Sequence, residues 1–162
     1  MAIAWRIVRK QYVDSAFSGI GAEKYGGRWN SPGRKVVYVA DSLALAAMET
    51  LVHLPYPLPA RFHDKCDFQA FQIEIPDPLI QLFPKDNLPI DWQLEPPSQN
   101  TQNIGDRWIR EGRSVVLKLA STLVPLEYNY LLNPEHDDFS KLVIREPVSY
   151  AFDTRFTTQL SP

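Results

Sequence analysis

A chain of 162 residues with a formal net charge of −2 and 44% hydrophobic residues has the composition of one folded domain, not of a disordered segment. The charge balance gives no basic stripe of the kind that nucleic-acid-binding proteins carry, and no apolar run approaches the ~18 residues of a membrane span. A single cysteine, Cys66, excludes an intrachain disulfide and argues against a cysteine-based metal site, so we expect one cytoplasmic domain over residues 1–162 without metal, membrane or direct nucleic-acid binding.

The first part of the chain is predicted to fold as strand, loop, strand and helix. Short apolar runs favour strands at 2–8 and 36–40, and the second run is typical of a strand covered on both faces. Residues 14–34 are rich in glycine and polar side chains, so we expect a structured loop there without a regular element. Asp41 or Ser42 then caps a helix that runs to about His53.

The rest of the chain is predicted to be richer in strands. A proline-rich irregular stretch is expected over 81–98, and an amphipathic helix over 101–111 has Gly112 at its C-cap. The expected strands and the helical turn among them lie at 68–75, 114–120, 127–132, 137–142 (the turn) and 143–150. Because strands and helices do not alternate regularly, the order favours an α+β fold over a doubly wound sheet.

Glu49 is an acid on a helix that is apolar almost all round, a pattern typical of a buried helix. A carboxylate in such a place is costly unless a partner or a cleft receives it. His53 follows at i+4 on the same face and is a candidate to orient Glu49. The spacing alone leaves an ordinary alternative open, in which Glu49 marks a narrow solvent-facing edge or makes a structural salt bridge.

The stretch Gly26-Gly27-Arg28-Trp29-Asn30 could bring backbone amides and a guanidinium together on an anion such as a pyrophosphate. It has neither the Walker spacing nor the dinucleotide fingerprint, and a hairpin turn with Trp29 packed on the core fits the pattern as well. Tyr38 shares a strand face with Val36 and Ala40. An aromatic residue there belongs to the core, unless that face opens into the same cleft as Glu49.

Together these segments resemble the RES domain, the toxin half of RES–Xre toxin–antitoxin pairs in bacteria. The similarity extends over nearly the whole chain, and its parts come in the right order. The matching stretches are GGRWN at 26–30, Val37-Tyr38, Met48-Glu49 with His53, Ala120-Ser121, and 128–136 with Asn129. One departure is that the family's serine usually follows a proline, whereas Ala120 precedes Ser121, so Ser114 remains a second candidate.

The resemblance implies a single domain like the ADP-ribosyltransferase toxins, with a mostly antiparallel split sheet, a few flanking helices and NAD⁺ as substrate in the cleft. It implies a toxin that cleaves the nicotinamide–ribose bond by hydrolysis or phosphorolysis and is held inactive by an Xre-type antitoxin. Protein ADP-ribosylation at the same site is the first alternative. A non-catalytic nucleotide- or partner-binding module is the second. A homodimer is a possible assembly.

The resemblance also implies roles for individual residues. Glu49 would stabilise positive charge on the ribose, and Arg28 would hold the pyrophosphate. Tyr38 would orient the nicotinamide ribose, and Ser121 would bind the ligand or position Glu49. The expected catalytic residues are therefore Arg28, Tyr38, Glu49 and Ser121. The residues expected to contact NAD⁺ are Arg28, Trp29, Asn30, Tyr38, Ser121 and Asn129.

Overall fold

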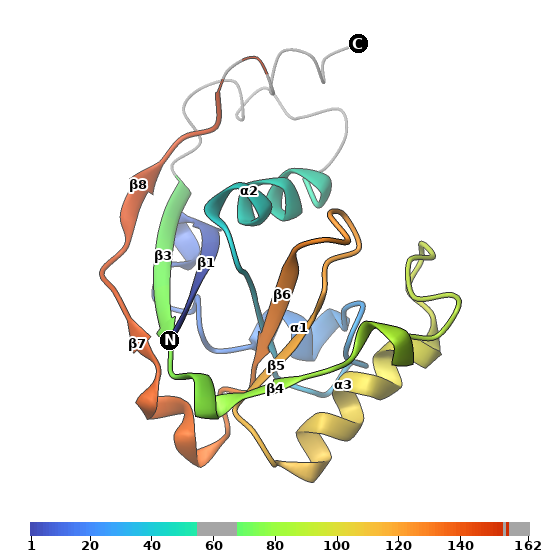
Figure 1. Ribbon diagram of the computed structural model, residues 1–162. Coiled ribbons are helices and arrows are strands. Elements are labelled where there is room, and N and C mark those ends of the chain that lie inside the picture. The colour runs from blue at the N-terminus through green and yellow to red at the C-terminus, as the bar shows by residue number, and fades with distance from the viewer. Residues whose placement is uncertain (55–67, 154, 156–162) are drawn as a thin grey trace.

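The strands of the protein form one curled sheet, seen in a computed structural model that describes residues 1–54, 68–153 and 155 (Figure 1). The strands are β1 (Ala2–Arg9), β2 (Val37–Ala40), β3 (Phe68–Ile75), β4 (Ile80–Leu82), β5 (Val116–Ala120), β6 (Tyr128–Leu132), β7 (Val143–Ile144) and β8 (Val148–Tyr150). Their order is β4-β5-β6-β2-β1-β3-β7, with β8 also paired to β3. Among the described strands, only β4 and β5 pair in parallel. The expected α+β class with a mostly antiparallel sheet is confirmed.

The sheet is divided between β1 and β2. These strands pair only at Trp5 and Ala40, whereas β1 and β3 pair along their full length. Figure 1 shows β1, β3, β7 and β8 diverging from β6, β5 and β4. Where the ladder is missing, Nη1 of Arg6 donates a hydrogen bond of 2.6 Å to the carbonyl oxygen of Tyr38. The predicted split of the sheet is confirmed, and a guanidinium bridges it in place of backbone pairing.

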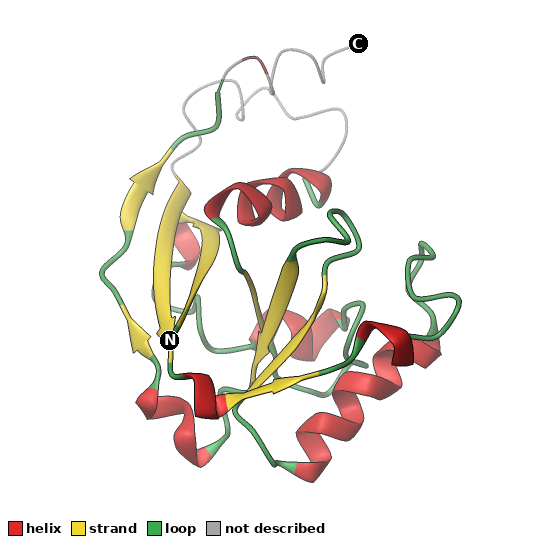
Figure 2. Cartoon of the chain, viewed as in Figure 1, coloured by secondary structure: helices red, strands yellow, loops and turns green. Residues whose placement is uncertain are grey.

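Helices flank the sheet (Figure 2). They are α1 (Ile20–Tyr25), α2 (Leu43–Val52) and α3 (Gln99–Glu111), with short 3-10 helices at Lys10–Tyr12, Asp77–Leu79, Lys85–Asn87 and Asp137–Lys141. Helix α3 packs Ile104 and Trp108 against Leu117 of β5 and Leu131 of β6. Gly105 faces the 26–30 turn, where a Cβ atom would lie 1.7 Å from the Trp29 carbonyl oxygen. The close approach of α3 to this turn therefore depends on a residue without a side chain.

Three expectations were wrong in detail. Helix α1 lies inside the stretch expected to be a loop, because Gly19 and Gly26 bound the helix with positive φ instead of interrupting it. The stretch expected to be irregular and proline-rich overlaps β4. This strand consists of three residues that pair in parallel with β5, and it is too short for an alternation of apolar and polar residues to predict it. The last predicted strand is two strands, since Pro147 has no N–H to continue the ladder.

The other predicted elements are confirmed to within a few residues. Helix α2 begins after Ser42, whose side chain accepts a hydrogen bond from the Leu45 amide. Helix α3 begins after Ser98 and ends at Gly112, with φ 58°. Cys66 and the prolines expected to end α2 lie outside the described residues. No helix in the described ranges is both long and apolar enough to cross a membrane.

Candidate functional site

Helix α2, which carries Glu49, lies at the surface and not in the core. Leu45 and Ala46 are buried, but Met48 is 47% and Val52 57% exposed, so the expectation of a helix buried all round was wrong. The apolar residues of a helix show which of its faces can be buried. They do not show whether another element of the fold packs against each face. Glu49 is half-buried, beside the packed face of the helix.

Glu49 is held by neutral donors. Its Oε1 accepts a hydrogen bond of 2.6 Å from Nδ2 of Asn129 and one of 3.3 Å from Oγ of Ser121. Among the described residues no cation forms an ion pair with this carboxylate. His53 is exposed, and no hydrogen bond joins it to Glu49 within the described part of the chain. The salt-bridge alternative and an orienting role for His53 therefore find no support.

The start of α2 is tied to β6, the strand that carries Asn129. Oγ of Ser42 donates 2.8 Å to Oε2 of Glu127, and Oδ2 of Asp41 accepts 3.0 Å from the amide of Tyr128. Burial raises the pKa of Asp41, and the neighbouring Glu127 adds to this shift, although the Tyr128 amide opposes it. These contacts fix the first turn of α2 relative to β6, and they thereby determine the position of Glu49 relative to Asn129.

Ser121 and Ser114 occupy different environments. Ser121 is fully buried, and its Oγ accepts hydrogen bonds from the amides of Leu123 and Val124 at 3.1 and 3.2 Å. With both acceptor positions filled, its hydroxyl proton is directed to Glu49. Ser114 instead accepts from the indole of Trp108 under α3. The structure thus brings Ser121, and not Ser114, to Glu49.

The 26–30 turn is a small hairpin that holds Tyr38. Gly27 and Asn30 form an antiparallel bridge that closes the turn, and Trp29 is only 2% exposed. Both features agree with the alternative of a hairpin turn with Trp29 packed on the core. Oη of Tyr38 donates 2.7 Å to Oδ1 of Asn30 and accepts 3.1 Å from the Trp29 amide. A Cβ atom at position 27 would lie 2.6 Å from this Oη, so glycine is required there. Burial raises the pKa of Tyr38 well above its ordinary value and keeps the phenol neutral.

The amide of Asn30 is used within the chain. Its Nδ2 donates to the carbonyl oxygens of Ala22, Ser31 and Arg34 at 3.0 to 3.2 Å, and its Oδ1 receives the Tyr38 hydroxyl. The residue is 0% exposed. Asn30 therefore links α1, the hairpin and β2, and no free donor remains on it for a ligand.

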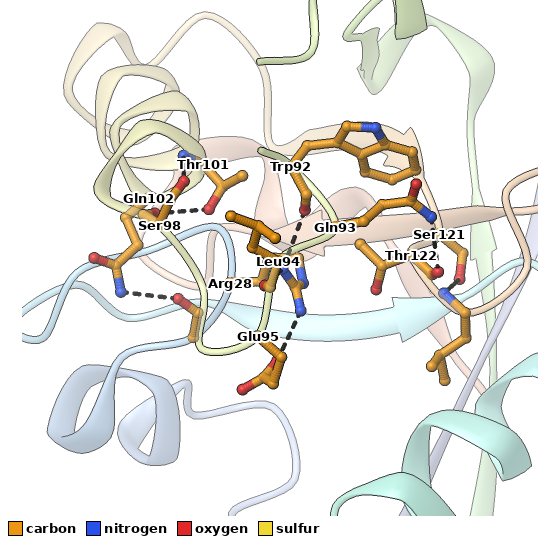
Figure 3. Close-up of polar contacts among 12 residues, drawn as sticks. Arg28, Trp92, Gln93, Leu94, Glu95, Ser98, Thr101, Gln102, Ser121 and Thr122 are labelled. Atoms are coloured by element: carbon orange, nitrogen blue, oxygen red, sulfur yellow. Dashed lines mark hydrogen bonds and ion pairs between the residues drawn. The ribbon is translucent and has the colours of Figure 1, made fainter. Parts of the chain in front are cut away.

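Arg28 projects from the tip of the hairpin into the segment Trp92–Glu95, here called the 92–95 loop (Figure 3). Its Nη1 donates to the carbonyl oxygens of Trp92 and Leu94 at 3.1 and 2.7 Å, and its Nη2 pairs with Oε2 of Glu95 at 2.9 Å. The Arg28 side chain is 15% exposed, and that of Glu95 is 75% exposed. The guanidinium is thus surrounded by oxygen atoms, one of them anionic.

The 92–95 loop connects the surroundings of Arg28 with those of Ser121. Nε2 of Gln93 donates 3.3 Å to the carbonyl oxygen of Thr122, directly after Ser121 (Figure 3). In the described part of the chain no hydrogen bond or ion pair joins Arg28 to Glu49 itself. The predicted residues therefore form linked groups: Glu49 with Ser121 and Asn129, Tyr38 with its hairpin, and Arg28 with the loop that reaches Thr122.

Arg6 is a residue that the sequence analysis missed. Besides its bond to Tyr38, its buried Nε has no hydrogen-bond partner among the described residues. Burial lowers the pKa of Arg6 to about 10, which leaves it charged at neutral pH. A signal existed, because a cation in the middle of the apolar strand AIAWRIV requires an explanation in the same way as Glu49 on its apolar helix.

The chain matches a known protein family over nearly its whole length. The family model described as RES domain matches residues 3–153. The chain belongs to the RES domain family. The RES domain covers nearly all of the chain, including Arg28, Tyr38, Glu49, Ser121 and Asn129.

Curated relatives of this RES domain chain cover nearly its full length. One named Toxin Res, from Yersinia enterocolitica, is 41% identical over 152 residues, 93% of this chain and 97% of the relative. One named Prs ADP-ribosylating toxin, from a Sphingobium species, is 35% identical over 157 residues, 93% of this chain and 94% of the relative.

A solved structure shares the fold. A chain in the crystal structure of the M. tuberculosis MbcT–MbcA toxin–antitoxin complex superposes with a TM-score of 0.72 at 16% identity, covering 98% of this chain and 88% of that one. Together with the Sphingobium relative, this agrees with the expected likeness to ADP-ribosyltransferase toxins. Among the described residues, no group of three or more His, Cys, Asp or Glu side chains could hold a metal ion.

Proposed function

We propose that this RES domain chain is a toxin that consumes NAD⁺ by cleaving the bond between nicotinamide and ribose. The observation that supports this most directly is the state of Glu49. It is a half-buried carboxylate, fixed in place by Asn129 and Ser121, and both partners are neutral. An acid whose charge is held but not cancelled suits a reaction that develops positive charge next to it.

The proposed reaction separates nicotinamide from C1′ of the ribose. Nicotinamide leaves as a neutral molecule with the electron pair of the glycosidic bond, and positive charge develops on C1′ and the ring oxygen. Glu49 stabilises this charge. Water or inorganic phosphate then forms the new bond to C1′. Hydrolysis by water releases one proton to solvent and yields ADP-ribose, and attack by phosphate yields its 1-phosphate.

The other residues bind and orient in this proposal. Arg28 holds the pyrophosphate, and to do so it exchanges Glu95 for a phosphate oxygen while keeping its fork geometry. Tyr38, whose hydroxyl is locked in the hairpin, offers its ring to the ribose end of the ligand. Ser121 positions Glu49 and does not serve as a nucleophile, because its oxygen already accepts two amide hydrogen bonds.

A second candidate reaction is ADP-ribosyl transfer to a protein. The 35% identical relative named Prs ADP-ribosylating toxin favours it, and the same charge stabilisation by Glu49 would serve. A chain that depletes NAD⁺ has to be restrained in its host. The structural similarity to a chain of a toxin–antitoxin complex supports an antitoxin partner, for which we propose the Xre type, acting in the cytoplasm.

The test is nicotinamide release from NAD⁺ by the purified protein, with and without phosphate, followed by mass spectrometry of the products. Free ADP-ribose indicates hydrolysis, its 1-phosphate indicates phosphorolysis, and an adduct on a protein indicates transfer. Glu49→Gln keeps the shape and both partners, and should lower kcat about 10²-fold, the scale of one lost electrostatic stabiliser. Glu111→Gln, at the exposed end of α3, is the control.

Two outcomes would contradict the proposal. Near-normal turnover by Glu49→Gln would remove the assigned role of that carboxylate. NAD⁺ binding without any nicotinamide release would instead identify the chain as a non-catalytic binding module.

A further inference from the structure

We propose that Asn129 is a positioning residue that acts on the reaction through Glu49, and not through contact with NAD⁺. This inference rests on the proposed function above and changes the role expected for Asn129 from the sequence. Its basis is the 2.6 Å hydrogen bond from Nδ2 of Asn129 to Oε1 of Glu49, shorter than the 3.3 Å bond from Ser121 to the same atom. Oε2 of Glu49 has no hydrogen-bond partner among the described residues.

Asn129 is placed on the most firmly held part of the site. In β6 it pairs with Leu119 of β5 on one side and with Ala40 of β2 on the other. Glu49 projects from a helix with one exposed face, and a glutamate side chain has several freely rotating bonds. The hydrogen bond from Asn129 therefore transfers the rigidity of the central sheet to the carboxylate on α2.

The chemistry of the amide matches this role. A carboxamide N–H donates to a carboxylate without carrying a charge of its own, so it fixes the acid without cancelling the negative charge. A lysine or arginine here would form an ion pair and oppose the stabilisation of positive charge on the ribose. Ser121 cannot substitute fully, because two amides already bind its oxygen and its contact with Glu49 is the longer one.

The first test separates positioning from ligand binding. Asn129→Ala should lower kcat about tenfold, the scale of one hydrogen bond to a charged group, while KM changes less than about twofold. Asn103→Ala, at an exposed position of α3, is the matched control and should leave both constants unchanged. In a Glu49→Gln background, Asn129→Ala should lower kcat by less than about twofold, because the group that it positions is already altered.

The second test uses the isosteric Asn129→Asp, which keeps the shape should the alanine variant fold poorly. Two carboxylates within hydrogen-bonding distance share one proton near neutral pH, so the acidic limb of the kcat–pH profile should move upward by about one unit or more. Over the pH range in which the variant remains folded, lost stability alone would not move that limb.

Failure of this inference and failure of the proposed function give different results. A wild-type protein that releases no nicotinamide overturns both. An active wild type overturns the inference alone if Asn129→Ala raises KM and keeps kcat, if the two substitutions act independently, or if Asn129→Asp keeps the wild-type pH profile.

Discussion

The two charged residues proposed for catalysis are held in opposite ways. Glu49 is fixed by neutral side chains of β6 and the turn after β5, which belong to the most regular part of the fold. Arg28 is fixed by two backbone carbonyls and an exposed glutamate of the irregular 92–95 loop. No cation among the described residues pairs with the acid, whereas Glu95 compensates the charge of the arginine. In the proposed reaction Glu49 can act in the position seen here, whereas Arg28 has to exchange Glu95 for the ligand.

Gly105→Ala should give the largest effect, and its cause lies on the Arg28 side of this comparison. A methyl group there would lie 1.7 Å from the Trp29 carbonyl oxygen, so α3 or the hairpin has to move. Overpacking against backbone of this kind should lower the free energy of unfolding by about 3 kcal/mol. Urea denaturation measures this change in the free energy of unfolding.

Gly21→Ala is the matched control for Gly105→Ala, since a Cβ atom at position 21 meets nothing within 4 Å. It should leave the protein equally stable or more stable by about 0.5 kcal/mol, because alanine favours the helix. Equal unfolding midpoints for the two variants would mean that α3 does not set the position of the hairpin.

Arg28→Ala should come next in size. It should lower kcat/KM for NAD⁺ about tenfold to hundredfold, mainly through KM, because bonds to a charged phosphate are lost. Arg28→Lys keeps the charge but loses the planar guanidinium, so its kcat/KM should lie between those of Arg28→Ala and the wild type. Steady-state kinetics of nicotinamide release measure both variants. Wild-type kinetics in Arg28→Ala would show that this arginine serves only to anchor the 92–95 loop.

Glu95→Gln should give the smallest effect, and in the opposite direction. Removing the anion that competes for Arg28 should lower KM for NAD⁺ by about twofold to fivefold, the range of one exposed ion pair, with kcat unchanged. Glu135→Gln removes a comparably exposed partner from Lys35 and is the control. A raised KM in Glu95→Gln would indicate that Glu95 holds Arg28 in its binding geometry and does not compete with the ligand.

The sequence predicted the fold class and most elements because their signals are local. Ser42 caps the start of α2 with its side chain, and Gly112 ends α3 with a left-handed backbone conformation, and both signals depend only on neighbouring residues. The strand β4 and the exposed face of α2 were not predictable in this way. A three-residue parallel pairing, and the exposure of Met48 and Val52 on α2, depend on parts of the chain distant in sequence.

The residues of the candidate site were proposed from the sequence, but the contacts between them were not. Glu49 could be recognised as an acid that needs a partner, and Arg6 carried the same kind of signal on β1. That the partner of Glu49 is Asn129, 80 residues further along the chain, follows only from the meeting of α2 and β6. The contact between Arg28 and the 92–95 loop likewise has no sequence pattern, since two of its acceptors are backbone carbonyls.

The oxygen atoms around Arg28 also amount to a pharmacophore. Nη2 donates to an anionic oxygen, while Nη1 donates to two neutral carbonyl oxygens. A compound that presents a carboxylate or phosphate beside two carbonyl groups in this arrangement would displace the 92–95 loop from its arginine. Design of an inhibitor for this chain can therefore start from a template that the protein itself provides.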